Sequence, residues 1–530
     1  MESIINKNTM VVFISALIAG YFFSTIHNFE QRAVDAGLVL AEVVVYPDQI
    51  SPMKEYFLKS WTSINQTSKL LLDFNFSLKI VSKIIIFLVT ILYFLGVFLT
   101  VNSATKSILL SILLSVMILI FQKNMGDTDY PSLFFSEHTY GMMSLALVTC
   151  IFGLLISGNL FLGGLLSSLL ISIHPLVGAW LTGIIIVTLI INKYFFKINY
   201  NKKNLIKGLS VGLIFTLISL FYHLYIVSDF NSQFDLKSYE NYMKYWEGHR
   251  FEAAYHLEYF LKTLLLFIFT LISLKIFKNK FTENFRFGIL FIFNSIILST
   301  FFYFFYKFFH SYMPDIVFRI MPTRFTIIHS VIGWPIILSI IFVLLKSFEN
   351  KKYIFKNLSY SLILFVIIGY SISHYKVFIK LKNSFVINTS THQNFLEEEK
   401  FWNTIKHDNL SGYILTSFST STISMRKTFK PILLDVSSFD FIPYFPNTAK
   451  NVSLIVEKIY GIPFDQPPKN IRNRPFLTDE NIRPIFESYS NEKWKVLSKN
   501  FNFKGIIIPT DWVINLPLKI KSKKFSFYII

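Results

Sequence analysis

The chain has 530 residues, of which 53% are hydrophobic, 18% aromatic and only 16% charged. A soluble domain carries roughly a quarter charged residues, so this composition excludes an ordinary soluble protein and indicates a polytopic α-helical membrane protein. The net charge of +19 does not point to nucleic acid, because a basic excess in a membrane protein usually lies in cytoplasmic loops. We therefore expect the lipid bilayer as a partner and no nucleic acid.

The first apolar run covers about residues 10 to 26, close to the roughly 20 residues that a spanning helix needs. No small-residue cleavage site follows it, since the next residues read His27, Asn28, Phe29 and Glu30. We expect a retained first span rather than a cleaved signal peptide. The chain has a single cysteine, so no disulfide within the chain is possible.

Further apolar runs predict about eleven transmembrane helices in all, judged by the length that a bilayer requires. They lie near residues 82–101, 107–121, 140–157, 160–173, 176–192, 206–228, 257–277, 287–307, 325–345 and 354–373.

The loops between these runs differ in charge according to the side on which they fall. Every dense, short basic loop falls on one side, which includes Lys106, Lys193, Lys197, Lys202, Lys203, Lys207, Lys275, Lys278, Lys280 and Arg286. The positive-inside rule makes that side cytoplasmic. The N-terminus is then cytoplasmic and the C-terminus extracytoplasmic, and we expect the inner (cytoplasmic) membrane of a bacterium.

Acidic residues, histidines and isolated arginines gather on the opposite side. The long loop 27–81 carries Glu30 and Asp35 shortly after the first span, and its later part predicts one or two amphipathic helices in the membrane interface. Those helices would cap the bundle, shape a substrate site, or do both. Ionisable groups at the bilayer edge are costly unless they are paired, hydrated or used, so a site facing outward is expected.

The loop from Gly126 to Gly141 packs four ionisable side chains between two apolar runs. Asp127 and Asp129 have a spacing that lets both carboxylates point to one site, which suits a divalent cation such as Mg or Mn, or a pair of sugar hydroxyls. Glu137 and His138 follow, and His138 begins the next span. The alternative is a plain turn, because Asp and Gly are ordinary turn residues.

His174 and Pro175 interrupt a long apolar stretch. Proline breaks a helix at the residue before it, so a tight turn between two short spans accounts for the backbone. An imidazole at such depth needs a polar partner, and the acidic loop is the nearest candidate.

Two further outer loops contain candidate ligand contacts. Arg319 and Arg324 lie in loop 308–324, where a guanidinium fits phosphate bidentately; a snorkelling anchor is the alternative. Loop 229–256 combines Trp246, His249 and Arg250, a mixture that suits contact with a sugar or acceptor but equally an interfacial belt.

The composition changes after about residue 373. Residues 374–530 contain a helix-like stretch, FLEEEKFWNTIKH, and the strand-like runs GYILTS, PILLDV, KGIIIPT and SFYII. They predict an extracytoplasmic α/β domain of roughly 150 residues beside a transmembrane domain of residues 1–373. Arg426, Lys430 and Asp435 belong to its most polar patch.

These features together resemble the GT-C superfamily of membrane glycosyltransferases: many spans, an acidic residue just after span one, an Asp-x-Asp-like pair between spans three and four, and a C-terminal outer domain. The resemblance implies that Glu30 or Asp35 is the general base for the acceptor, and that Asp127 and Asp129 hold a metal or the donor. The chain lacks the WWD-type signature of the members that transfer oligosaccharide to peptides, so the resemblance does not extend to that reaction.

The expected activity is transfer of a sugar from a polyprenyl-phosphate-linked donor to a glycan or lipid acceptor outside the cytoplasm. Arg319 and Arg324 would neutralise the leaving phosphate. One rival is a polysaccharide polymerase or ligase, which shares the outward site. Another is a transporter of a lipid-linked or small substrate, which predicts inverted repeats with broken helices.

Overall fold

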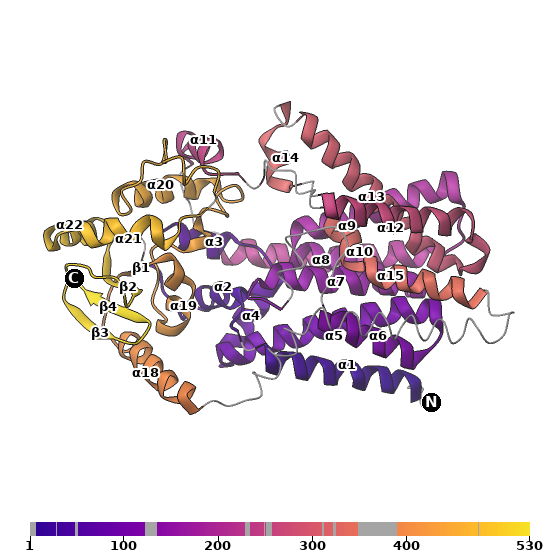
Figure 1. Cartoon of the computed structure of the whole chain (residues 1–530), viewed down its shortest axis with the longest axis horizontal. Coiled ribbons are helices and arrows are strands. Elements are labelled where there is room, and N and C mark those ends of the chain that lie inside the picture. The colour runs from indigo at the N-terminus through magenta and orange to yellow at the C-terminus, as the bar shows by residue number, and fades with distance from the viewer. Residues whose placement is uncertain are drawn as a thin grey trace.

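The computed structural model describes residues 7–27, 29–47, 51–121, 135–227, 234–248, 250, 257–309, 312–321, 325–347, 389–474 and 476–530. A bundle of long helices forms one end of the molecule, and an α/β unit built from residues 389–530 forms the other (Figure 1). We call the latter the C-terminal unit. The helices of the first loop lie between the two parts.

Ten helices make up the described part of the bundle. They are α1 (Lys7–Ile26), α5 (Leu78–Thr105), α6 (Ile108–Phe121), α7 (Thr139–Ser157), α8 (Leu160–Ile173), α9 (Pro175–Ile191), α10 (Lys202–Ile226), α12 (Leu257–Lys275), α13 (Glu283–Phe309) and α15 (Thr326–Ser347).

Seven helices among the described residues are long and apolar enough to cross a membrane: α1, α5, α7, α9 with the π-helical turn that follows it, α10, α13 and α15. The helices α6 and α8 are equally apolar but shorter. The chain is therefore an integral membrane protein. A total of eleven spans stays a prediction, and the expected span 354–373 lies outside the described residues.

Glycines allow the central helices of the bundle to approach closely. A Cβ atom on Gly96 of α5 would overlap the backbone of Thr149 on α7, and one on Gly153 of α7 would overlap the backbone of Gly96. Gly208 of α10 meets Phe161 of α8 in the same way. Such small-residue crossings are typical of membrane helices, which gain no hydrophobic driving force from one another. They make α7 the most buried span.

Several of the lysines on which the predicted orientation rests lie at one end of the bundle. The N-terminus lies at the end far from the C-terminal unit (Figure 1). Because successive helices run up and down, the ends of α5 and α12 and the start of α10 lie at that far end, with Lys106, Lys275, Lys202 and Lys203. That this end is cytoplasmic stays a prediction.

The first loop contains three helices: α2 (Arg32–Leu40), α3 (Pro52–Lys59) and α4 (Ser63–Asp73). The helices α3 and α4 lie in the later part of the loop, where the sequence predicts one or two helices, and α2 precedes them. The side chains of Ser51 and Thr62 accept hydrogen bonds from backbone N–H groups in the first turns of α3 and α4, which fixes where these helices begin. The helix α2 is buried along almost its whole length. It therefore lies packed between the bundle and the C-terminal unit.

The C-terminal unit is built on a four-stranded sheet with the order β1-β2-β4-β3, in which β1 and β2 are parallel and the other neighbours antiparallel. The strands are β1 (Tyr413–Thr416), β2 (Phe503–Pro509), β3 (Leu518–Lys521) and β4 (Phe525–Ile529). The accompanying helices are α18 (Thr389–Lys406), α19 (Phe418–Thr428), α20 (Ala449–Lys458), α21 (Asp479–Ser488) and α22 (Asn491–Phe501), and α11 (Leu236–Tyr245) packs on α20.

The structure corrects the predicted sheet in two places. The run PILLDV forms a single bridge from Ile432 to Ile414 instead of a strand. The strand β3 was not predicted, because its sequence LKIK is largely exposed and lacks an apolar face. It pairs only with β4, so it is an edge strand that needs no buried side chains.

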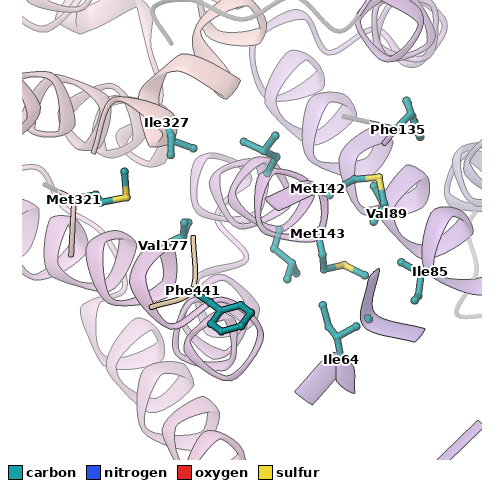
Figure 2. Close-up of a cluster of buried hydrophobic side chains, with 14 of the residues drawn as sticks. Ile64, Ile85, Val89, Phe135, Met142, Met143, Val177, Met321, Ile327 and Phe441 are labelled. Carbon is teal, nitrogen blue, oxygen red and sulfur yellow. The ribbon is translucent and has the colours of Figure 1, made fainter. Parts of the chain in front are cut away.

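A continuous core joins the two parts of the molecule. Phe441 of the C-terminal unit reaches the same cluster as Ile64 of the first loop and Met143 of α7 (Figure 2). The Phe441 ring also stacks on Tyr56, with ring centres 4.3 Å apart. The C-terminal unit is thus packed onto the first loop, and a site between them has fixed walls.

Candidate functional site

A cavity of about 1090 Å³ lies where the first loop, the C-terminal unit and the adjacent end of the bundle meet. We call it the junction cavity. Its walls come from the end of α1, the connection from α4 to α5, and the helices α18 and α19. The charged side chains that line it are Glu30, Glu137, Glu398, Glu399, Lys79, Lys83, Lys406, Arg426 and Lys427.

Arg426 of α19 connects the C-terminal unit to the first loop. Its Nε and Nη2 atoms donate to the two carboxylate oxygens of Asp35 at 2.6 and 2.7 Å, and the two side chains are only 5% and 7% exposed. Its Nη1 donates to the backbone carbonyl of Glu30 at 3.0 Å and to Glu137 Oε2 at 3.4 Å. A bidentate guanidinium is the geometry that holds carboxylates most firmly, so Arg426 fixes three acidic residues at once.

The structure separates the two candidate bases, Glu30 and Asp35. Burial raises the pKa of the Asp35 carboxyl, and the Arg426 guanidinium opposes that rise. Both oxygens of Asp35 are engaged by Arg426, which leaves none facing a substrate. Glu30 lines the cavity, has a side chain 23% exposed, and has Lys427 Nζ at 3.3 Å from its Oε1. Of the two, Glu30 is the carboxylate that faces the cavity.

A buried hydrogen-bond network holds the backbone between Glu30 and α2 against the start of α7. The backbone N–H of Gln31 donates to Ser82 Oγ at 2.9 Å, and its side-chain amide donates to the Ser136 carbonyl at 2.9 Å. The Thr139 hydroxyl donates to Gln31 Oε1 at 3.0 Å and accepts from the Ala33 N–H at 3.1 Å. The position of Glu30 is therefore set by three segments that are distant in sequence.

Glu137 and His138, which the sequence placed in the acidic loop, lie at the start of α7. Glu137 lines the cavity, and its Oε1 is 3.9 Å from the guanidinium of Arg32. His138 is the N-cap residue of α7, and burial, aided by Arg32, lowers its pKa. It is therefore neutral at physiological pH.

The expected metal or donor site at Asp127 and Asp129 lies outside the described residues. Among the residues that the structure describes, no group of three His, Cys, Asp or Glu side chains could hold a metal ion. The carboxylates of Glu30, Asp35 and Glu137 are instead paired with cationic side chains, so this part of the site does not fit a divalent ion. The metal stays a prediction that rests on the aspartate pair.

His174 forms the turn that the sequence suggested. It ends α8 and begins α9, and its Nδ1 accepts a hydrogen bond from the Val177 N–H at 3.5 Å. Its side chain does not line the junction cavity. The described geometry therefore gives His174 a capping role in the backbone.

Arg319 lies on α14 (Asp315–Ile320), away from the walls of the junction cavity. Its guanidinium lies over the ring of Tyr239, 5.2 Å from the centre, and Nε donates to the Tyr239 hydroxyl at 3.2 Å. The other arginine expected to bind phosphate, Arg324, lies outside the described residues. Arg319 thus packs against α11 rather than against the carboxylates of the cavity.

Trp246 and Arg250 are buried inside the C-terminal half of the molecule. The Trp246 indole is fully buried between Phe439 and Phe464 and donates to the Phe464 carbonyl at 2.8 Å. Arg250 forms a buried ion pair with Glu247. Neither side chain lines the junction cavity, so in this structure they hold the C-terminal unit to loop 229–256.

His249, the third residue of that group, lies outside the described residues. The structure brings three of the candidates, Glu30, Asp35 and Glu137, close to Arg426 and Lys427. The cationic side of the cavity is not predicted from the sequence. The sequence identifies Arg426 only as part of a polar patch. It does not indicate a role for the cavity lysines, because single lysines at helix ends are common; these are Lys79, Lys83, Lys406 and Lys427.

The chain was compared with known proteins by sequence and by structure. No protein-family model matches the chain, and no curated protein matches it in sequence. Among solved structures, it is similar to an oligosaccharyltransferase of Archaeoglobus fulgidus that was crystallised tethered to an acceptor peptide containing an NVT sequon. The match has a TM-score of 0.46 and 10% sequence identity, and covers 94% of this chain and 69% of the archaeal one. A likeness at this level does not establish a shared activity.

Proposed function

We propose that the protein is a membrane glycosyltransferase of the GT-C type, which transfers a sugar from a polyprenyl-phosphate-linked donor to a glycan or lipid acceptor on the extracytoplasmic side. The junction cavity is the observation that carries this proposal. It combines an accessible carboxylate, several cations and apolar side chains at the end of a membrane-spanning bundle. A substrate with a lipid tail, a phosphate and a sugar needs all three.

Glu30 acts as the general base in this proposal. Its carboxylate takes the proton of the acceptor hydroxyl while the acceptor oxygen bonds to the anomeric carbon of the sugar. The bond from that carbon to the phosphate oxygen breaks, and the polyprenyl phosphate leaves with the negative charge. The cationic side chains that line the junction cavity stabilise the negative charge that develops on the leaving phosphate.

Asp35 and Arg426 are positioning residues. The Arg426 guanidinium that pairs with Asp35 also contacts the Glu30 carbonyl and the Glu137 carboxylate. Buried, paired side chains can fix the position of neighbouring site residues to within fractions of an ångström. Asp127 and Asp129 remain candidates for binding a metal ion or the donor, and they belong to the same predicted loop as Glu137.

Mass spectrometry of the purified protein tests the proposal. The full-length chain is extracted in detergent and its co-purified lipids are identified. The lipid-linked sugars of the host membrane are then added, together with the host's surface glycans and lipids as acceptors, with and without the protein. We expect polyprenyl phosphate to be released only when the protein is present. Binding of the lipid-linked sugar with no release of polyprenyl phosphate would contradict the enzyme and favour a transporter.

A further inference from the structure

The bundle wall of the junction cavity carries two lysines that the proposed chemistry has not used. Lys79 and Lys83 lie on the first turns of α5, and both line the cavity. Residues four apart in a helix share one face, so their ammonium groups project from the same side of α5. Across the cavity stand Lys406 and Lys427 of the C-terminal unit.

This lysine pair does not contribute to folding in any way that the structure reveals. Like charges four residues apart destabilise a helix, and cations are unfavourable in its first turns. Three of the four carboxylates that line the cavity are paired with other cations: Glu30 with Lys427, Glu137 with Arg426, and Glu398 with Lys524. The fourth, Glu399, is exposed and, in the part of the chain that the structure describes, forms no ion pair with either lysine. Within the described residues, neither lysine has an ion-pair partner. An anionic ligand would offset the repulsion between them.

Apolar side chains lie directly beside the lysines. Phe74 and Ile80 are 68% and 45% exposed, and Phe76 is 41% exposed and lines the cavity. Phe74 and Phe76 belong to the connection from α4 to α5, and Ile80 lies on the first turn of α5, a candidate membrane span. Cations beside exposed aromatic rings suit a ligand whose anionic group is attached to an apolar chain.

We propose that Lys79 and Lys83 bind the phosphate or diphosphate oxygens of the ligand that occupies the junction cavity. Two ammonium groups on one helix face supply charge-assisted hydrogen bonds to the same oxyanion. This assignment is an alternative to the phosphate contact that the sequence predicts at Arg319 and Arg324. The inference deepens the proposed function and rests on it only for the sugar and the lipid attached to the phosphate.

The test measures binding of three probes to the full-length protein in detergent by microscale thermophoresis: farnesyl phosphate, inorganic phosphate and farnesol. We expect Lys79→Gln/Lys83→Gln to weaken farnesyl phosphate binding by roughly tenfold or more, because two charge-assisted hydrogen bonds are lost. Lys79→Arg/Lys83→Arg keeps both charges and should bind within a few fold of wild type. Farnesol binding should not respond to either change.

The chain provides a matched control. Lys203 and Lys207 have the same spacing on the first turns of α10, are exposed, and lie at the opposite end of the bundle. Lys203→Gln/Lys207→Gln should bind farnesyl phosphate as the wild type does. Tight binding of farnesyl phosphate but not of inorganic phosphate would assign a lipid headgroup, whereas equal binding of both would assign a free phosphate.

Unchanged binding of farnesyl phosphate by Lys79→Gln/Lys83→Gln would overturn the assignment. The failure of this site is distinguishable from the failure of the proposed function. If the variant binds normally and the wild type releases polyprenyl phosphate, the lysine site is wrong and the transferase stands. If the variant loses binding and the wild type releases no polyprenyl phosphate, the anion site stands and the transferase is wrong.

Discussion

Arg426 determines which acidic residues of the first loop are buried and which face the cavity. Its bidentate contact buries Asp35, while its third nitrogen contacts Glu30 and Glu137 near the cavity. A buried ion pair contributes little net stability, but the loss of one partner leaves a buried charge that nothing compensates. The pair therefore serves to fix the position of Glu30 rather than to react.

Replacing one member of this pair should destabilise the protein. Asp35→Asn leaves Arg426 charged and buried, and we expect it to lower the free energy of unfolding by about 3–5 kcal/mol. The double change Asp35→Leu/Arg426→Met removes both charges, and it should recover most of that loss. Thermal unfolding of the detergent-solubilised protein measures both. If Asp35→Asn unfolds at the wild-type temperature, Arg426 does not depend on Asp35.

Sequence reasoning could find the acidic side of this site but not its pairing. Glu30, Asp35 and Glu137 were recognised because carboxylates are rare at the edge of membrane spans. Which of them is accessible depends on Arg426, which lies 391 residues after Asp35 in the chain. No local sequence pattern indicates a contact over that distance, so the sequence alone leaves Glu30 and Asp35 as equal candidates for the proposed base.

Among the elements, the crossing of α5 and α7 controls the geometry beneath the cavity. The helix α5 carries Lys79 and Lys83, and α7 begins directly after Glu137 and His138. Gly96 and Gly153 set the separation of the two helices. The distance between Lys79 and Lys83 on α5 and Glu137 before α7 therefore depends on two glycines, Gly96 and Gly153, farther along the same helices.

Gly96→Ala should destabilise the bundle by about 1–3 kcal/mol, because the added methyl group would overlap the backbone at Thr149 and force the helices apart. Gly183→Ala is the control: nothing lies within 4 Å of a Cβ at that position, and alanine favours a helix more than glycine does. Circular dichroism during thermal unfolding compares the two. Equal unfolding temperatures would show that the crossing tolerates a side chain.

Helices were easier to predict than strands, for a physical reason. Long apolar runs indicate spans by length alone, and the structure has a helix at each expected run within its described residues. Strands in the C-terminal unit depend on partners that are distant in sequence. PILLDV is as apolar as a strand but pairs with β1 through a single bridge. The polar segment β3 is a strand because it pairs with the free edge of β4.

For the whole molecule, the account requires the C-terminal unit and the first loop to lie on the extracytoplasmic side. The protein offers a clean labelling experiment, because its one cysteine, Cys150, is buried. Glu480→Cys on exposed α21 should react with a membrane-impermeant maleimide on intact cells, and Lys203→Cys on α10 should react only after the cells are opened. The reverse pattern would invert the topology and contradict the outward-facing site.

The most direct test of the account is the release of polyprenyl phosphate by Glu30→Gln. The amide has the same shape as the carboxylate but cannot take a proton, and general bases contribute roughly 10²- to 10⁴-fold to rate. We expect the rate of release to fall by about that factor, with the unfolding temperature unchanged, while Glu480→Gln on the exposed surface keeps the wild-type rate. A wild-type rate in Glu30→Gln would show that sugar transfer, if it occurs, does not use the carboxylate of the junction cavity.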